Sequence, residues 1–310
     1  MTNLQIMSLI GLILYFGLLL FAVTKEKKNT NVLDYFFAGR SLPFWALSIT
    51  FIASWWGAGS AISTADLAYE DGLGAFWYYG VPVLISTFLM IIGAAVLTGT
   101  LIVLIYSMFG GFRGVVLTDI IQFVLLLASA VCVFVVAMMN SGGFSQIAKA
   151  AEEAGKSDYM SMGAGASKYL GYVITFGCAW MIQANVWQRI SAARSDRDAR
   201  KMTVMSFFAY IPLYLIVVFT GMAGLVIFDK MPEGGIVTSL VTGYMPPVLG
   251  ALAFVGISAA IMSTMDSLIN TGAMTLSMDL LPENRSESQK LNFSRIATLL
   301  VTAVAFVISI

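Results

Sequence analysis

Long apolar runs separated by short polar connections dominate the sequence. Eight of them approach or exceed the length of about 20 residues that a helix needs to span a bilayer. They cover residues 5–23, 44–65, 75–110, 117–139, 168–187, 204–228, 246–270 and 292–310. This pattern predicts an all-α polytopic membrane protein. The first run is not expected to be a cleavable signal peptide, because its basic residues, Lys25, Lys27 and Lys28, follow the run instead of preceding it.

Basic residues gather in alternate connections and so indicate which side of the membrane each connection faces. They lie at 25–40, at 113, at 189–201 and at 285–295, whereas the other connections are acidic or mixed. Basic connections favour the cytoplasmic side, so one crossing per run places the N-terminus outside. The dense cluster from Arg189 to Lys201 is then a cytoplasmic topology anchor. The connection 140–168 is expected to be extracellular and to contain a short amphipathic helix.

Composition supports the membrane assignment and limits the partners. Hydrophobic residues make up 59% of the chain and charged residues 11%, against about 25% charged residues in soluble domains. The expected setting is therefore a lipid bilayer, taken to be the plasma (inner) membrane. The formal net charge is zero, which gives no reason to expect a nucleic-acid partner.

The run from Gly74 to Gly110 does not fit a single crossing. It holds no charge over about 37 residues, which as a helix would measure roughly 55 Å, nearly twice the hydrocarbon thickness. Two crossings would need a turn, for which only Thr98-Gly99-Thr100 is a weak candidate, and would place the richest basic connection outside. We interpret the run as two spans joined with something missing between them.

Two hydroxyls and a carboxyl interrupt the span near residue 260. They belong to the segment Ala259 to Asp266, in which Ser263 and Thr264 are adjacent. Polar groups clustered within hydrocarbon are costly unless they face a cavity, an ion or each other. Two hard oxygens from one helical turn suit a small cation such as Na⁺, with backbone carbonyls completing the shell. The alternative is that both hydroxyls bond to carbonyls one turn earlier.

Small residues also weaken the second span, in the segment Ile52 to Ser60 (IASWWGAGS). A helix break there would free carbonyls at the middle of the membrane, where transporters with discontinuous helices bind ions and substrates. Close helix–helix packing through small residues is the alternative.

Four stretches, in order along the chain, resemble the sodium/solute symporter family, which includes sodium/proline, sodium/pantothenate and sodium/galactose cotransporters. They are Asp34 to Pro43 (DYFFAGRSLP), Tyr106 to Gln122 (YSMFGGFRGVVLTDIIQ), Gln188 to Lys201 (QRISAARSDRDARK) and Ala259 to Asn270 (AAIMSTMDSLIN). The resemblance implies a leucine-transporter-like core of two inverted five-helix repeats, preceded by an extra N-terminal helix. The extra helix would be 5–23, the first repeat 44–139 and the second 168–310, within one transmembrane domain of residues 1–310.

The resemblance also implies a Na⁺ site between the broken first core helix and the eighth. Carried over by position, the ligands are the carbonyls of Ala53, Trp56 and Ala260 and the hydroxyls of Ser263 and Thr264. Neutral oxygens suit an ion that must also leave during each cycle. Na⁺ is then the coupling ion, and no organic cofactor is expected.

Two carboxylates are candidates for the ion pathway. Asp119 matches the family's carboxylate on the fifth core helix, although an acid near a helix start is also favoured by the helix dipole. Asp266 could face the cytoplasmic release path or pair structurally with a polar neighbour.

The resemblance assigns the substrate pocket to the first, second and sixth core helices. Aromatic faces with one or two amides suit a small polar or zwitterionic solute, although aromatic residues in membrane bundles also serve packing and interface roles. The candidate substrate-binding residues are Trp55, Ser60, Tyr79, Trp180 and Gln183.

The chain is too short for all ten core helices of the family. Aligned by motif, 75–110 is the second core helix followed directly by the fourth, and 292–310 is the ninth, so the third and tenth are absent. Neighbouring polar faces would then meet lipid, which is costly. A shortened gene product, a fragment that needs a partner chain to supply the missing helices, and a sequence that joins separate segments all remain open.

We therefore expect a Na⁺-coupled symporter of a small polar organic solute that works by alternating access. The alternative is a non-transporting truncated remnant or fragment with only a structural or regulatory role, and a uniporter or proton-coupled version of the fold is also open. An enzyme is not expected. The sequence contains no histidine and no clustered intramembrane carboxylates.

Overall fold

The computed structural model describes residues 2–24, 32–97, 112–280 and 285–309. Within these ranges all regular secondary structure is helical, apart from a single isolated bridge between Leu42 and Ala193. The helices are α1 (Asn3–Thr24), α2 (Val32–Phe37), α3 (Phe44–Trp55), α4 (Ala58–Asp71), α5 (Phe76–Leu97), α7 (Phe112–Ser141), α8 (Phe144–Glu153), α9 (Gly165–Ala179), α10 (Ala184–Ser191), α11 (Asp196–Ile227), α12 (Ile236–Gly243), α13 (Pro247–Leu280) and α14 (Glu287–Ser309). Short 3₁₀ turns cover Ala38–Arg40 (η1), Gly72–Ala75 (η2), Met162–Ala164 (η3) and Trp180–Ile182 (η4).

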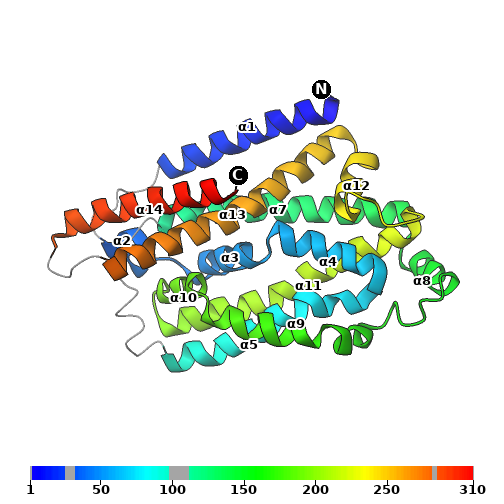
Figure 1. Ribbon diagram of the computed structural model, residues 1–310, viewed down its shortest axis with the longest axis horizontal. Coiled ribbons are helices and arrows are strands. Elements are labelled where there is room, and N and C mark those ends of the chain that lie inside the picture. Colours follow the sequence, from blue (N-terminus) through cyan, green and yellow to red (C-terminus); the bar gives the residue numbers. More distant parts are fainter. Residues whose placement is uncertain (1, 25–31, 98–111, 281–284, 310) are drawn as a thin grey trace.

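The long helices run along one common direction, and the short helices α2, α8 and α12 lie near the ends of the bundle (Figure 1). Helix α13 packs against α7, α14 and α1, while α11 packs against α3, α4, α5 and α7. The close-packed pair of α4 and α11 depends on a glycine, because a Cβ on Gly221 would lie 1.9 Å from the carbonyl oxygen of Ala65. These contacts place α3 and α4 in the centre of the bundle.

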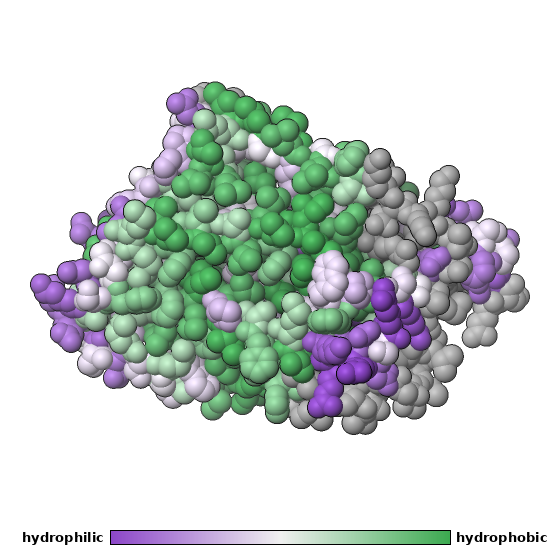
Figure 2. Space-filling view, turned by 180° about the vertical axis from the view of Figure 1, so that it is seen from behind, coloured by the Kyte–Doolittle hydropathy of each residue, from purple (hydrophilic) through white to green (hydrophobic). Residues whose placement is uncertain are grey.

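The surface of the bundle agrees with a membrane setting. In the view of Figure 2, apolar residues cover the middle of the molecule and hydrophilic residues gather towards its two ends. Among the described residues, four helices are individually long and apolar enough to cross a bilayer; they lie at Asn3–Ala22, Val115–Ser141, Asp196–Ile227 and Pro247–Ser277. The amphipathic helix expected within 140–168 is present as α8.

The second expected span is two helices instead of one, because the chain leaves the helical conformation at Trp56 and Gly57. Trp56 has φ −85° and ψ 61°, and Gly57 is extended with φ −82° and ψ 165°. The sequence pattern at Ile52 to Ser60 allowed either a break or close packing, and the structure shows the break. The last carbonyls of α3 therefore lack the amide partners that a continuous helix would supply.

The expected single span at 168–187 is also interrupted, so that prediction was wrong. Helix α9 ends at Ala179, η4 follows, and Gln183 is extended with ψ 124° before α10 begins. The apolar character of the run predicted one continuous helix, because no cluster of glycines marks the break. The two interruptions lie close together, with the Trp55 and Trp180 ring centroids 5.3 Å apart.

The long run at 75–110 is described only in part. Residues 76–97 form α5, and the junction at which two spans were interpreted as joined lies outside the described residues. The division into two five-helix repeats, with one helix absent from the first and the last absent from the second, stays a prediction.

Candidate functional site

The break between α3 and α4 faces the middle of α13, where Ser263 and Thr264 lie. The Ser263 Oγ is 3.0 Å from the Ala53 carbonyl oxygen and 3.2 Å from that of Ala260. The Thr264 Oγ1 is 3.2 Å from the Ala260 carbonyl and 3.5 Å from the Ser54 carbonyl. Each hydroxyl therefore bonds to a carbonyl of its own helix and also reaches the end of α3, and the Na⁺ site stays a prediction.

Four of the five candidate Na⁺ ligands are brought together in this way: Ala53, Ala260, Ser263 and Thr264. Trp56 lies at the break itself, next to Gly57, whose added Cβ would lie 3.0 Å from the Thr264 Oγ1. The carbonyl of Ser54, which the sequence analysis did not single out, contacts Thr264 directly. Its position two residues before the break was the available signal.

These oxygens suit a small monovalent cation. They are neutral carbonyl and hydroxyl groups, which are the hard ligands that alkali and alkaline-earth cations prefer. The carbonyls at the end of α3 also carry the partial negative charge of a helix C-terminus. A bound cation could be coordinated by these hydroxyl and carbonyl oxygens in place of the hydrogen bonds between them, because the two hydroxyl protons can rotate away.

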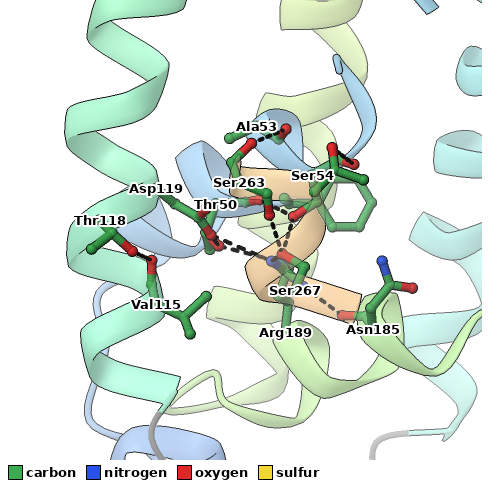
Figure 3. Close-up of polar contacts among 12 residues, drawn as sticks. Thr50, Ala53, Ser54, Val115, Thr118, Asp119, Asn185, Arg189, Ser263 and Ser267 are labelled. Atoms are coloured by element: carbon green, nitrogen blue, oxygen red, sulfur yellow. Dashed lines mark hydrogen bonds and ion pairs between the residues drawn. The ribbon is translucent and has the colours of Figure 1, made fainter. Parts of the chain in front are cut away.

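A buried polar cluster lies beside these oxygens (Figure 3). Asp119 on α7 accepts a hydrogen bond from Thr50 on α3 and forms an ion pair with Arg189 on α10, whose Nη2 lies 3.4 Å from Oδ2. Asp119 and Arg189 are 0% and 1% exposed. The assignment of Arg189 to a cytoplasmic topology anchor was wrong, because α10 carries this residue into the bundle before the exposed stretch that begins at Arg194.

A cavity of about 600 Å³ opens beside the break. All five candidate substrate residues line it: Trp55, Ser60, Tyr79, Trp180 and Gln183. Asn185 and Thr264 line it as well, so the cavity reaches one of the candidate Na⁺-binding residues.

Aromatic faces form one wall of the cavity. The ring centroids of Tyr79 and Trp180 are 5.6 Å apart and the rings are stacked, while Trp55 packs against Trp180. The Ser60 Oγ lies 3.0 Å from the Gly57 carbonyl and within 3.4 Å of the Tyr214 hydroxyl. The indole NH of Trp55 is buried without a hydrogen-bond partner among the described residues.

The comparisons with known proteins agree on the family. The model of the sodium:solute symporter family matches residues 79–310, which is most of the chain. The chain belongs to the sodium:solute symporter family. Its members are transporters, so this chain belongs with membrane transport proteins and not with enzymes.

Relatives in this family differ in their solutes. The chain is 23% identical to a sodium/glucose cotransporter of Vibrio parahaemolyticus, over 93% of this chain and 71% of that protein. It is 28% identical to a sodium/sialic acid symporter of Aliivibrio fischeri and 27% identical to a sodium/proline symporter of Staphylococcus aureus. These two matches cover 66% of this chain but only 45% and 42% of the relatives.

The fold of the symporter chain matches that of a solved relative. A Na⁺-coupled sialic acid symporter, solved in a substrate-bound outward-open state, superposes with a TM-score of 0.72 at 17% sequence identity. The match covers 97% of this chain and 80% of the other. The leucine-transporter-like fold expected from the sequence is thereby confirmed.

Relatives in the family contain segments without a counterpart here. The comparison with the Vibrio cotransporter runs over 385 residues, although this chain has 310. It therefore includes stretches of the relative that this symporter chain lacks.

The structure places the second carboxylate apart from the cavity. Asp266 on α13 lies next to Gln122 on α7, and the amide nitrogen of Gln122 is 3.0 Å from the Tyr15 hydroxyl on α1. Of the two roles left open for Asp266, the geometry favours pairing with a polar neighbour. Asp119 lies seven residues beyond the start of α7 and therefore past its first turn. The helix dipole acts mainly within the first turn, so it does not explain the position of this carboxylate.

Proposed function

We propose that this chain is a Na⁺-coupled symporter that moves a small polar organic solute by alternating access. The observation that carries the proposal is the meeting of the Ser263 and Thr264 hydroxyls with the carbonyls at the broken end of α3. The proposed Na⁺ ligands are Ala53, Trp56, Ala260, Ser263 and Thr264. Membership of the family supports Na⁺ as the coupling ion.

Coupling would follow from the shared position of the break. The interrupted helix supplies proposed ion ligands and also lines the cavity, and Thr264 is present in both places. Na⁺ binding would fix the end of α3 against α13 and thereby shape the cavity wall formed by Trp55. A solute that binds better to the Na⁺-bound form of the cavity then stabilises the form that holds both ion and solute. This coupling of the two binding events lets an ion gradient drive uptake.

Binding of ²²Na⁺ to the purified protein tests the ion site. Wild type should show saturable binding, and the double variant Ser263→Ala/Thr264→Ala should lose it. The matched control is Ser258→Ala/Thr275→Ala, since both residues lie on α13 and bond to the carbonyl one turn earlier, as Ser263 and Thr264 do. A folded wild type without saturable binding would refute the proposal and leave the remnant alternative.

The cavity favours a solute without net charge. None of its described lining side chains is ionisable apart from the tyrosine, and a buried charge without a partner is costly. Tryptophan and tyrosine faces with the amides of Gln183 and Asn185 fit a polar uncharged molecule or a zwitterion. Tryptophan fluorescence titrations in the presence of Na⁺ with a sugar, a zwitterionic amino acid and a monocarboxylate separate these classes.

One border of the cavity is apolar and open. Ile261, Met265 and Leu268 line it from α13 and are 56%, 46% and 57% exposed. We propose that helices of a partner chain cover this border in the working transporter. Na⁺-dependent uptake by proteoliposomes that contain this chain alone would refute the need for a partner.

We also propose that the symporter resides in the plasma (inner) membrane with its N-terminus outside. The basic connections support this orientation. Impermeant labelling of a cysteine introduced at Thr2 in intact cells tests it, with a cysteine at the exposed Arg197 as the control for the opposite side.

A further inference from the structure

A second cavity, at the start of α11, is lined by cations that the proposed transport does not use. Its volume is about 420 Å³. Its lining residues are Phe44, Arg197, Arg200, Lys201, Val204 and Met205. The three cations are exposed, and no carboxylate is among the described lining residues. The cavity is therefore suited to an anionic group.

The charges of these three cations are not neutralised by the protein. Within the described part of the chain none of them forms an ion pair. Asp196 and Asp198 are close in the sequence but do not line the cavity. The Lys201 ammonium lies 5.3 Å from the centroid of the Phe44 ring, a contact that positions the cation and leaves its charge in place. An anion from outside the chain would supply the missing partner.

One face of α11 changes from cationic to apolar as the helix enters the bundle. Residues three or four apart share a helix face, so Arg197 and Lys201 are followed there by Met205 and Phe208. Met205 and Phe208 are 40% and 63% exposed. Phe208 lies roughly 10 Å beyond Lys201 along the axis, at 1.5 Å per residue. An anionic group at the cations would thus have exposed apolar surface directly beside it.

An anionic phospholipid has this same order of chemical groups, a phosphate followed by acyl chains. Basic pockets on the cytoplasmic side of membrane proteins bind anionic headgroups, and the cytoplasmic leaflet carries negative charge. Guanidinium groups also match the geometry of a phosphate. A soluble phosphate compound would use the cations alone and leave Met205 and Phe208 uncovered. Membrane orientation depends on the number of basic residues in a connection and does not require them to line a cavity.

We propose that Arg197, Arg200 and Lys201 bind the headgroup phosphate of an anionic phospholipid, with an acyl chain lying along Met205 and Phe208. The site shares no residue with the proposed ion and solute sites and does not depend on the proposed symport. Helix α11 packs against both α3 and α4, which flank the break in the bundle. A bound lipid would therefore hold one end of the helix that supports both halves of the interrupted span.

Quenching of tryptophan fluorescence by brominated lipids tests the site. Phe208→Trp places a reporter where the acyl chain would lie, and the spectrum of the protein without this change is subtracted. The reporter protein is reconstituted in mixtures of phosphatidylcholine and phosphatidylglycerol, with one or the other brominated. Phosphatidylglycerol should be preferred near the reporter about fivefold, which is the effect of one cation near an anionic surface.

Two double variants in the reporter protein separate a site from a general attraction to basic surface. Arg197→Gln/Lys201→Gln should abolish the preference for phosphatidylglycerol. Arg285→Gln/Arg295→Gln is the matched control, because it removes two exposed arginines of another basic connection, and it should keep the preference.

Equal quenching by the two brominated lipids in the protein with all its charges would overturn the inference without any charge variant. A preference that survives Arg197→Gln/Lys201→Gln, or that is lost equally in both double variants, would overturn it as well. Displacement of brominated phosphatidylglycerol by soluble glycerol phosphate would show a site for a soluble anion and not for a lipid. Failure of ²²Na⁺ binding would refute the proposed symport and leave this result unaffected.

Discussion

Replacing Gly57 with alanine should weaken Na⁺ binding without disturbing the backbone. The φ and ψ of Gly57 lie in the extended region that alanine also adopts. The added Cβ, however, would lie 3.0 Å from the Thr264 Oγ1, and ordinary contacts begin at 3.4 Å. The hydroxyl must therefore retreat by about 0.4 Å, the difference between those two distances.

That displacement exceeds what a metal–ligand distance tolerates, which is about 0.2 Å. A polar contact to a charged partner contributes about 1.5–3 kcal/mol. Partial loss of one ligand in five should then cost about 1.4 kcal/mol, or a tenfold rise in the Kd for Na⁺. Titration of ²²Na⁺ binding on the purified variant measures this directly.

Gly59→Ala is the matched control. Its added Cβ would meet nothing within 4 Å, and alanine favours a helix by about 1 kcal/mol over glycine. We expect an unchanged Kd for Na⁺ and equal or higher thermal stability. In the double variant Gly57→Ala/Thr264→Ser the smaller side chain can turn its hydroxyl back, so part of the affinity should return. A wild-type Kd in Gly57→Ala would refute the placement of Thr264 in the ion site.

Three further changes test the fold and the cavity. Gly221→Ala would force α11 away from α4, since its Cβ would lie 1.9 Å from the Ala65 carbonyl, and should lower stability by about 1–3 kcal/mol in thermal unfolding in detergent. Tyr159→Phe removes the buried hydroxyl that donates to two carbonyls of α4. Burial raises the pKa of this phenol, so the hydroxyl keeps its proton at all ordinary pH. Its loss should lower the free energy of unfolding by about 1–2 kcal/mol in the same assay. Trp180→Ala removes part of the aromatic wall that Trp180 forms with Tyr79. It should raise the apparent Kd for solute at least tenfold, whereas the Kd for Na⁺ should stay within twofold. An equal rise in both Kd values would contradict separate sites for solute and ion.

The meeting of Ser263 and Thr264 with the end of α3 was largely predictable from the sequence, because polar side chains are unusual within a membrane span. Ser263 and Thr264 stand out within a membrane span, and the small residues around Gly57 mark the break that faces them. The resemblance to a known family then supplied the carbonyl partners. The fold class followed from the same apolar runs, since only helices and closed barrels satisfy backbone groups within lipid.

The buried arginine was not predictable from local pattern alone. Arg189 begins a cluster of basic residues, and such clusters usually anchor the cytoplasmic side. The available signal was spacing, since four uncharged residues separate Arg189 from Arg194 and keep it on α10 instead of the exposed connection. Its partner Asp119 is 70 residues away in the sequence, and only the packing of α10 between α3 and α13 brings the two charges together.

The neutral chemistry of the proposed Na⁺ ligands has an electrical consequence. Carbonyl and hydroxyl oxygens carry no formal charge, and the Asp119–Arg189 pair cancels its own. A bound ion therefore adds one whole positive charge to the carrier, and the voltage across the membrane acts on the loaded form with about 2.3 kcal/mol per 100 mV. The empty carrier gains no such charge at these groups. Transport should therefore become faster as the cytoplasmic side becomes more negative. The voltage should accelerate the reorientation of the Na⁺-bound carrier and not the return of the empty carrier.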